Sequence, residues 1–209
     1  MTDGRRLAGA AADAAAICRS VREQATLAIA AGIDVIQVRE PELAARDLFA
    51  LANAIVALTR ESATRVIIND RLDVALASGA HGVHLRSSSP LPHEIRPRVP
   101  GGFLIGRSVH DVQAARMAAG ADYLIAGTVW PTASKPPDHG TIGVGGFGEI
   151  VRAAAPIPVL AIGGVTLERA PLAVAQGAAG IAAIGLFVPL DEIAGSGLAS
   201  IVKSLHAMR

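Results

Sequence analysis

The feature that most constrains the fold is a repeated alternation of short β-branched runs with longer segments rich in alanine and leucine. Seven runs have the length and composition of strands: 35–39, 65–69, 82–85, 103–106, 123–127, 158–162 and 180–184. The segments that carry apolar residues at helical spacing are 44–58, 72–78, 111–119, 147–154, 167–176 and 190–205. Because repeated strand-then-helix units require parallel strands, the alternation predicts an α/β protein with a parallel sheet.

An eighth strand at the amino terminus would complete a (β/α)8 barrel of the TIM type. Thr2-Asp3-Gly4 has the position of a very short first strand, and residues 10–30 would form the helix that follows it. Glycines follow the last two predicted strands, where such barrels place phosphate-binding backbone. We therefore predict a single TIM-barrel domain over residues 1–209, with a doubly wound open sheet as the alternative.

Composition excludes several classes of protein. The formal net charge is +1, with one tryptophan and one tyrosine, which disfavours a nucleic-acid partner because neither a basic surface nor stacking platforms are available. Cys18 is the only cysteine, which excludes an intrachain disulfide and a cysteine-based zinc site and fits a reducing cytoplasm. No apolar run reaches the ~18 residues of a membrane span, and Asp13 interrupts the alanine-rich run that faintly imitates a signal peptide. We expect a cytoplasmic protein without a membrane partner.

Polar residues at the carboxyl ends of the predicted strands form the candidate site, because these ends meet on one face of a barrel. The set contains Gln37, Arg39, Asn69, Asp70, Ser87, Ser88, Ser89, Ser108, His110, Thr128, Thr132, Ser134 and Lys135, with the glycines at 163, 164 and 185. Cationic and hydroxyl donors dominate it, together with one carboxylate and one imidazole. This mixture predicts an anionic, phosphorylated small molecule as the ligand.

Some of these residues have a direct physical reason to contact such a ligand. Without a Cβ atom, Gly163, Gly164 and Gly185 allow the backbone to approach a phosphate closely, although tight turns alone would also explain them. Arg39 follows Gln37 at the alternate position, so both side chains are expected on one face of the strand. The Arg39 guanidinium could then clamp a carboxylate or phosphate, or form an ion pair with a nearby carboxylate.

Two side chains could take part in chemistry. His110 directly precedes a predicted helix start, which places its ring over the pocket, and imidazole is the usual proton shuttle near neutral pH. A structural role is the alternative. Asp70 could bind Mg²⁺ together with substrate oxygens, cap the helix over 72–78, or do both. His84 lies inside a predicted strand, and we expect it to pack in the core.

Several segments resemble the thiamine phosphate synthase/TenI superfamily, in family order across nearly the whole chain. They are 36–40, 67–75, 82–85, 105–110, 120–123, 131–135 and 161–165. The resemblance implies a barrel that binds a phosphorylated thiazole, with one of two activities. The synthase joins hydroxymethylpyrimidine pyrophosphate to thiazole phosphate with Mg²⁺, whereas the TenI-type thiazole tautomerase aromatises a carboxythiazole phosphate without metal.

Two departures from the family pattern favour the tautomerase. In the synthase a lysine that contacts pyrophosphate stands two residues after the matching arginine, where this chain has Pro41. A second metal-binding aspartate of the synthase corresponds here to Ser89. Since departure of pyrophosphate requires its charge to be neutralised, these losses disfavour the synthase reaction. We therefore expect an isomerase, a TenI-like thiazole tautomerase of thiamine biosynthesis with no cofactor.

In this interpretation His110 moves the proton with help from Ser108, and Gly163, Gly164 and Gly185 hold the phosphate. The ring and carboxylate are positioned by Gln37, Arg39, Asn69, Thr132, Ser134 and Lys135. One alternative is a thiamine phosphate synthase that binds Mg²⁺ at Asp70 and uses Lys135 and Arg86 in place of the missing groups. Another is a non-catalytic thiazole-phosphate-binding regulatory protein. Apolar helices such as the segment 193–205 permit a homodimer.

Overall fold

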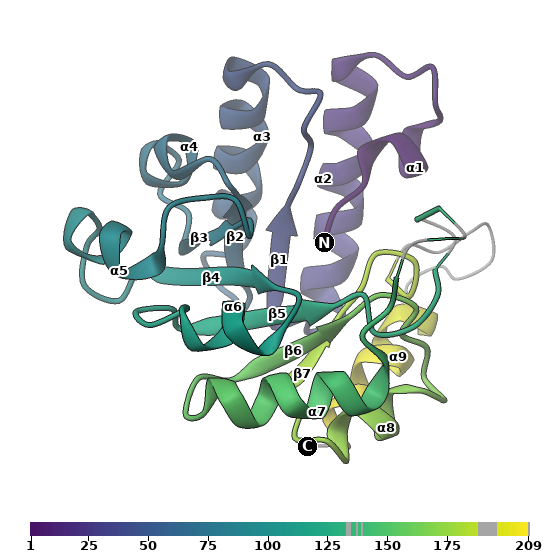
Figure 1. The fold of residues 1–209 in the computed structure, drawn as a ribbon. Helices are drawn as coiled ribbons and strands as arrows, with labels where there is room; N and C mark the ends of the chain where they lie inside the picture. The colour runs from purple at the N-terminus through teal and green to yellow at the C-terminus, as the bar shows by residue number, and fades with distance from the viewer. Residues whose placement is uncertain (133–134, 137, 139, 188–195, 209) are drawn as a thin grey trace. The chain divides into compact units, whose positions relative to one another are not determined.

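The structure, a computed structural model, describes residues 1–132, 135–136, 138, 140–187 and 196–208. Its strands are β1 (Val35–Val38), β2 (Arg65–Asn69), β3 (Gly82–Leu85), β4 (Leu104–Val109), β5 (Tyr123–Gly127), β6 (Val159–Ile162) and β7 (Gly180–Ala182). They are hydrogen-bonded neighbours in chain order in a seven-stranded parallel sheet (Figure 1). The seven predicted strands are confirmed. The doubly wound alternative is wrong, because its strand order reverses partway through the sheet.

The helices also lie where the apolar periodicity predicted them, with different ends. They are α1 (Gly4–Ala8), α2 (Ala14–Ala30), α3 (Ala45–Leu58), α4 (Leu72–Ala77), α5 (Pro92–Ile95), η1 (Arg96–Arg98), α6 (Val112–Arg116), α7 (Gly143–Ala154), α8 (Ala170–Val174) and α9 (Ser196–His206). Helix α2 begins late because the Asp13 carboxylate accepts the N–H of Ala16 at 2.7 Å and so caps it. Helices α1 and α5 escaped prediction because each is a single short turn. Among the described residues, no helix has both the length and the apolar character needed to cross a bilayer.

The expected first strand at Thr2-Asp3-Gly4 is wrong. Asp3 instead caps α1, its carboxylate accepting the N–H of Arg6 at 3.1 Å. The N–H of Thr2 donates to the carbonyl of Gln37 at 2.9 Å, so the chain touches the end of β1 without pairing along it. The described residues therefore show a seven-stranded sheet and not the eight-stranded barrel that we predicted.

The described residues form two compact units, one within Met1–Val83 and Phe187–Val202, the other within His84–Leu186 and Lys203–Arg209. In the first unit α2 and α3 lie side by side next to β1 (Figure 1). Helix α2 buries Ile17 and Val21, and α3 buries Leu51 and Ile55. Each such side chain contributes roughly 1.5–3 kcal/mol when fully buried, so this apolar burial helps to hold α2 and α3 in the first unit.

The core of the second unit is built around Phe147 and Ile150 of α7. These side chains are buried with Leu124 of β5 and with Val159 and Ala161 of β6. Helix α7 begins at Gly143, four residues before the predicted start, because Val144 and Phe147 both pack against this core. The irregular stretch before α7 therefore ends at Ile142, the residue at the cap position of the helix.

Candidate functional site

In the first unit, β1 and β2 bring two predicted site residues into contact. Gln37 of β1 is 5% exposed, and its Nε2 donates to Oδ1 of Asn69, the last residue of β2, at 3.0 Å. An amide pair of this kind presents donors and acceptors in a fixed orientation, as recognition of a heteroaromatic ring requires. The structure thus joins Gln37 and Asn69 in one hydrogen-bonded group.

Asp70 follows β2 directly and has a left-handed backbone, with φ of 62°. Aspartate tolerates this region better than most residues, and such conformations cluster at functional sites. Arg71, rather than Asp70, occupies the cap position of α4 and makes no side-chain cap hydrogen bond. Asp73, on the first turn of α4, is bound by Arg71 through two hydrogen bonds of 2.6 and 2.8 Å.

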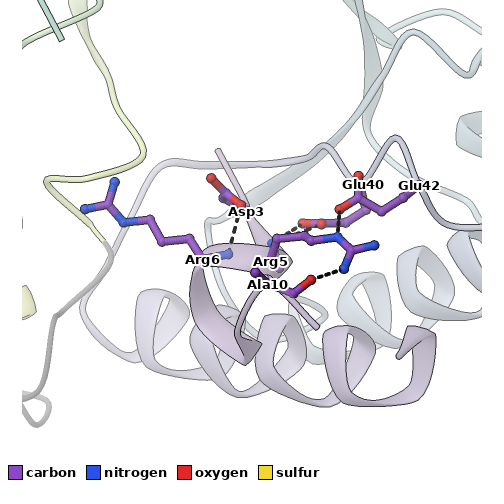
Figure 2. A network of polar contacts seen from close by, with 7 residues as sticks. Asp3, Arg5, Arg6, Ala10, Glu40 and Glu42 are labelled. Carbon is purple, nitrogen blue, oxygen red and sulfur yellow. Dashed lines mark hydrogen bonds and ion pairs between the residues drawn. The ribbon is translucent and has the colours of Figure 1, made fainter. Parts of the chain in front are cut away.

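The residues after β1 lie against the amino-terminal turn (Figure 2). Arg39 is exposed, and its N–H donates to Oγ1 of Thr2 at 3.0 Å. Glu40 is 4% exposed, and its carboxylate oxygens accept the N–H of Gly4 at 3.0 and 3.1 Å. A Cβ at position 4 would lie 2.4 Å from Cγ2 of Ile17, so only glycine fits so close. Arg5 binds Glu42 at 2.9 Å and also donates to the Ala10 carbonyl.

Burial gives Glu40 an unusual charge balance. Loss of solvation raises the pKa of its carboxyl above the ordinary value of 4.5, more than the hydrogen bonds from Thr2 and Gly4 lower it. The nearby carboxylates of Asp3 and Glu42 raise the pKa further. Sequence reasoning missed this residue as a structural centre, because its partners lie 36 residues away in the chain.

In the second unit, Ser108 of β4 and His110 just after it occupy the predicted strand end. His110 is exposed, and its Nδ1 lies 2.5 Å from the carbonyl of Gly127. Since a carbonyl can only accept, Nδ1 carries the proton of this bond and Nε2 faces elsewhere. Ser108 Oγ lies 2.9 Å from Nε2 of His84, which is 2% exposed as expected for a core residue.

Both the backbone conformation and the close packing of the turn after β6 require glycine at positions 163 and 164. Its φ angles are 96° and 63°, and a Cβ at Gly164 would lie 2.4 Å from the Pro131 carbonyl oxygen. Arg169 supports the turn by donating to the Gly164 carbonyl at 2.7 Å, with its guanidinium 5.8 Å from the centre of the Trp130 ring. The structure therefore explains these glycines through packing, and phosphate binding stays a prediction.

The remaining predicted residues lie on exposed or irregular segments. The five-residue helix α8 begins only at Ala170, so no helix directly follows the Gly163-Gly164 turn. Gly185 is exposed after β7. Thr132 is partly exposed and Lys135 is exposed, with the N–H of Lys135 donating to the Thr132 carbonyl at 3.2 Å. Ser134 lies outside the described residues.

The loop after β3 is held by an arginine that the sequence did not single out. Arg107 of β4 is 6% exposed, and its guanidinium donates to the carbonyls of Ser87, Ser89 and Pro90 at 2.9, 3.2 and 2.9 Å. Burial lowers the pKa of Arg107, although a guanidinium stays charged at every ordinary pH. Oγ of Ser89 accepts the N–H of Arg86 at 3.1 Å, which closes the loop on itself.

Comparisons with known proteins identify the family. The family model described as thiamine monophosphate synthase matches residues 10–187. A thiamine-phosphate synthase of Methanoculleus marisnigri is 44% identical over 177 residues, which cover 84% of this chain and 83% of the relative. Its counterpart in Coprothermobacter proteolyticus is 41% identical over 178 residues, 84% of this chain and 83% of the relative.

A solved structure agrees. A thiamine phosphate pyrophosphorylase from Pyrococcus furiosus superposes with a TM-score of 0.74 at 30% identity, covering 90% of this chain and 88% of that one. The expectation of a tautomerase, and with it of an isomerase, is contradicted by these relatives, which are named for the synthase. Pro41 and Ser89 therefore do not exclude membership of the family named for the synthase. The chain belongs to the thiamine monophosphate synthase family.

Proposed function

We propose that this protein is a thiamine-phosphate synthase, a transferase that joins hydroxymethylpyrimidine pyrophosphate to thiazole phosphate. The observation that carries the proposal is its 44% identity to a thiamine-phosphate synthase across 84% of the chain. In this reaction the thiazole ring nitrogen forms a bond to the methylene carbon of the pyrimidine. The bond from that carbon to oxygen breaks, and pyrophosphate leaves with the electron pair.

Asp70, directly after β2, would bind the Mg²⁺ that this reaction implies. Mg²⁺ is usually bound through one or two carboxylates together with substrate phosphate oxygens and water. Asp70 supplies one such carboxylate, while among the described residues no group of three or more His, Cys, Asp or Glu side chains could hold a metal ion. Asp70 would therefore hold Mg²⁺ jointly with the substrate pyrophosphate. When bound, Mg²⁺ neutralises charge on the leaving group.

The other predicted residues take roles that suit their contacts. The Gln37–Asn69 amide pair would orient the pyrimidine ring, since its 3.0 Å hydrogen bond fixes which groups face the ligand. Ser108 and His110 would hydrogen-bond to substrate oxygens. The Gly163-Gly164 turn and Gly185 would bind the thiazole phosphate through backbone N–H groups.

Exposed cationic side chains would take the place of the family's lysine, where this chain has Pro41. Arg39, Arg86 and Lys135 are all exposed, and Thr132 and Ser134 are close to Lys135 in the sequence. Each cation can approach a highly charged pyrophosphate without the cost of burying a free charge. Their positive charge would then compensate for Pro41 and Ser89, which stand where the family pattern has a lysine and an aspartate.

Product formation from the two substrates, with and without Mg²⁺, tests the proposal. We expect Mg²⁺-dependent thiamine phosphate, and we expect Asp70→Asn to lower turnover at least ~100-fold, since loss of the metal site removes several kcal/mol of charge stabilisation. Asp73→Asn is the matched control, because Asp73 is paired with Arg71. No product from folded protein at high concentration would refute the synthase and favour a thiazole-phosphate-binding protein.

We also propose that residues 1–209 form one cytoplasmic domain built on the seven-stranded parallel sheet. The bond between Thr2 and the Gln37 carbonyl supports a place for the amino terminus beside β1. A homodimer is compatible with this proposal and is tested by the mass of the protein in solution.

A further inference from the structure

A buried histidine links three neighbouring strands of the second unit. His84 of β3 is 2% exposed, and its Nε2 lies 2.9 Å from Oγ of Ser108 on β4. Its Nδ1 lies 3.3 Å from the hydroxyl of Tyr123 on β5, and the two rings stack with centroids 5.6 Å apart. Both ring nitrogens of His84 therefore have a polar neighbour, and one of these neighbours is a predicted site residue.

Tyr123 reaches His84 only because position 106 carries no side chain. Gly106 pairs with Tyr123 in the parallel register of β4 and β5. A Cβ at Gly106 would lie 2.1 Å from Cζ of Tyr123 and 2.4 Å from its hydroxyl oxygen. The phenol thus passes over β4 to meet a residue of β3, which lies on the other side of β4 in the sheet.

The direction of the two hydrogen bonds follows from the phenol. Burial raises the pKa of Tyr123 far above its ordinary value of 10.0, so its hydroxyl keeps the proton. Within the described part of the chain His84 Nδ1 is the sole hydrogen-bond partner of this hydroxyl, so the O–H donates to Nδ1. An imidazole that accepts at Nδ1 carries its proton on Nε2, so His84 donates to Ser108 Oγ.

This chain of donors determines what Ser108 can do. Its oxygen already accepts from His84, so its own proton points to a different acceptor. Ser108 is partly exposed at the predicted strand end. Building on the proposed function, we propose that His84 and Tyr123 are positioning residues that orient the Ser108 hydroxyl as a donor to an anionic oxygen of the pyrophosphate substrate.

Nitrogen NMR of the imidazole tests the orientation without any need for turnover. We expect wild-type His84 to be neutral, with the proton on Nε2 and Nδ1 accepting. Tyr123→Phe removes the donor to Nδ1 and should allow the other tautomer to appear. A protonated Nδ1 in the wild-type protein would overturn the assignment.

Titration with inorganic pyrophosphate and Mg²⁺ tests whether the two residues act through Ser108. We expect Tyr123→Phe to weaken binding about fivefold, the value of one net hydrogen bond. Combined with Ser108→Ala it should weaken binding no further than Ser108→Ala alone. The control Phe147→Leu changes a core aromatic residue that is 0% exposed, and it should lower stability without such coupling. Additive effects of Tyr123→Phe and Ser108→Ala would overturn the proposal.

Two substitutions of His84 separate donation from packing. His84→Gln keeps an N–H group near the Nε2 position and should retain most of the affinity, whereas His84→Leu should weaken binding at least as much as Tyr123→Phe. Equal weakening by both folded variants would overturn the role of the donor. Wild-type protein that does not bind pyrophosphate would also overturn it, while binding without thiamine phosphate formation would overturn only the proposed synthase.

Discussion

Glu40 and Arg107 solve the same structural problem with opposite charges. Each is buried, at 4% and 6% exposed, and each holds a neighbouring segment through that segment's backbone. Glu40 accepts the N–H of Gly4 in the amino-terminal turn, whereas Arg107 donates to the carbonyls of Ser87, Ser89 and Pro90. A carboxylate can lose its charge by taking up a proton, but a guanidinium cannot lose its charge at ordinary pH.

The comparison shows that burial has different consequences for the two loops. The pKa of Glu40 is raised, so the amino-terminal turn is held by a group whose charge changes with pH. The pKa of Arg107 is lowered from 12.5 and still leaves the side chain charged. The loop after β3 should therefore stay fixed at every pH at which the protein is folded, and the amino-terminal turn should not.

The largest effect should come from Arg107→Met, which removes the donors of three carbonyls and keeps most of the side-chain volume. We expect the free energy of unfolding to fall by about 3 kcal/mol, as is typical when hydrogen bonds to a buried charge are lost. Urea unfolding measures it. Arg98→Met is the control, because Arg98 is exposed and bonds a single carbonyl, that of Glu94. An equal loss in both variants would show that Arg107 does not hold the loop.

Glu40→Ala should have the next largest effect. It leaves the N–H of Gly4 without its acceptor, and an unmade hydrogen bond of a buried group costs about 2 kcal/mol. Urea unfolding at neutral pH measures the loss. Glu42→Ala is the comparison, since Glu42 makes an ion pair with exposed Arg5 and should change stability by less than ~1 kcal/mol. An unchanged free energy of unfolding in Glu40→Ala would contradict the view that Glu40 holds its segment as Arg107 does.

The pH dependence of the free energy of unfolding distinguishes buried Glu40 from buried Arg107. Because folding raises the pKa of Glu40, the folded protein holds this proton more tightly than the unfolded chain. Its stabilising contribution is complete below the unfolded pKa of 4.5 and is lost as pH rises through the folded value. Wild-type stability should therefore fall over that window more than the stability of Glu40→Gln. Parallel curves from urea unfolding at several pH values would contradict this origin of the shift.

The smallest effect is expected at the exposed pair of Arg71 and Asp73. Their side chains are 39% and 66% exposed, so solvent screens the 2.6 Å contact. Asp73→Asn should change the free energy of unfolding by less than about 0.5 kcal/mol in urea unfolding at low salt. A loss as large as that of Glu40→Ala would mean that burial does not decide how strongly each substitution lowers the free energy of unfolding.

The strands and the residues at their ends could be predicted from the sequence, because both depend on local patterns. Val66, Ile67 and Ile68 form one buried β-branched run, and Asn69 and Asp70 follow it directly. Strand order needed only the rule that successive units add to one sheet. The seven strands therefore agreed with expectation even where their ends moved by a few residues.

The groups that stabilise the loops could not be predicted, because their partners are distant in the chain. Glu40 meets Gly4, 36 positions earlier, and His84 meets Tyr123, 39 positions later. Nothing in the composition of the segment around Arg107 indicates that its guanidinium faces inward. The error at Thr2-Asp3-Gly4 has a related cause, since Asp3 is a good helix cap and one contact with β1 does not make a strand.

The passage of Tyr123 over Gly106 restricts how this chain can change over evolutionary time. A methyl group at position 106 collides with the phenol, so a larger residue there is tolerated only after the side chain at position 123 has become smaller. That first change would remove the donor to His84. The two positions should therefore covary. Residues larger than glycine at position 106 should occur only in relatives that lack a tyrosine at position 123.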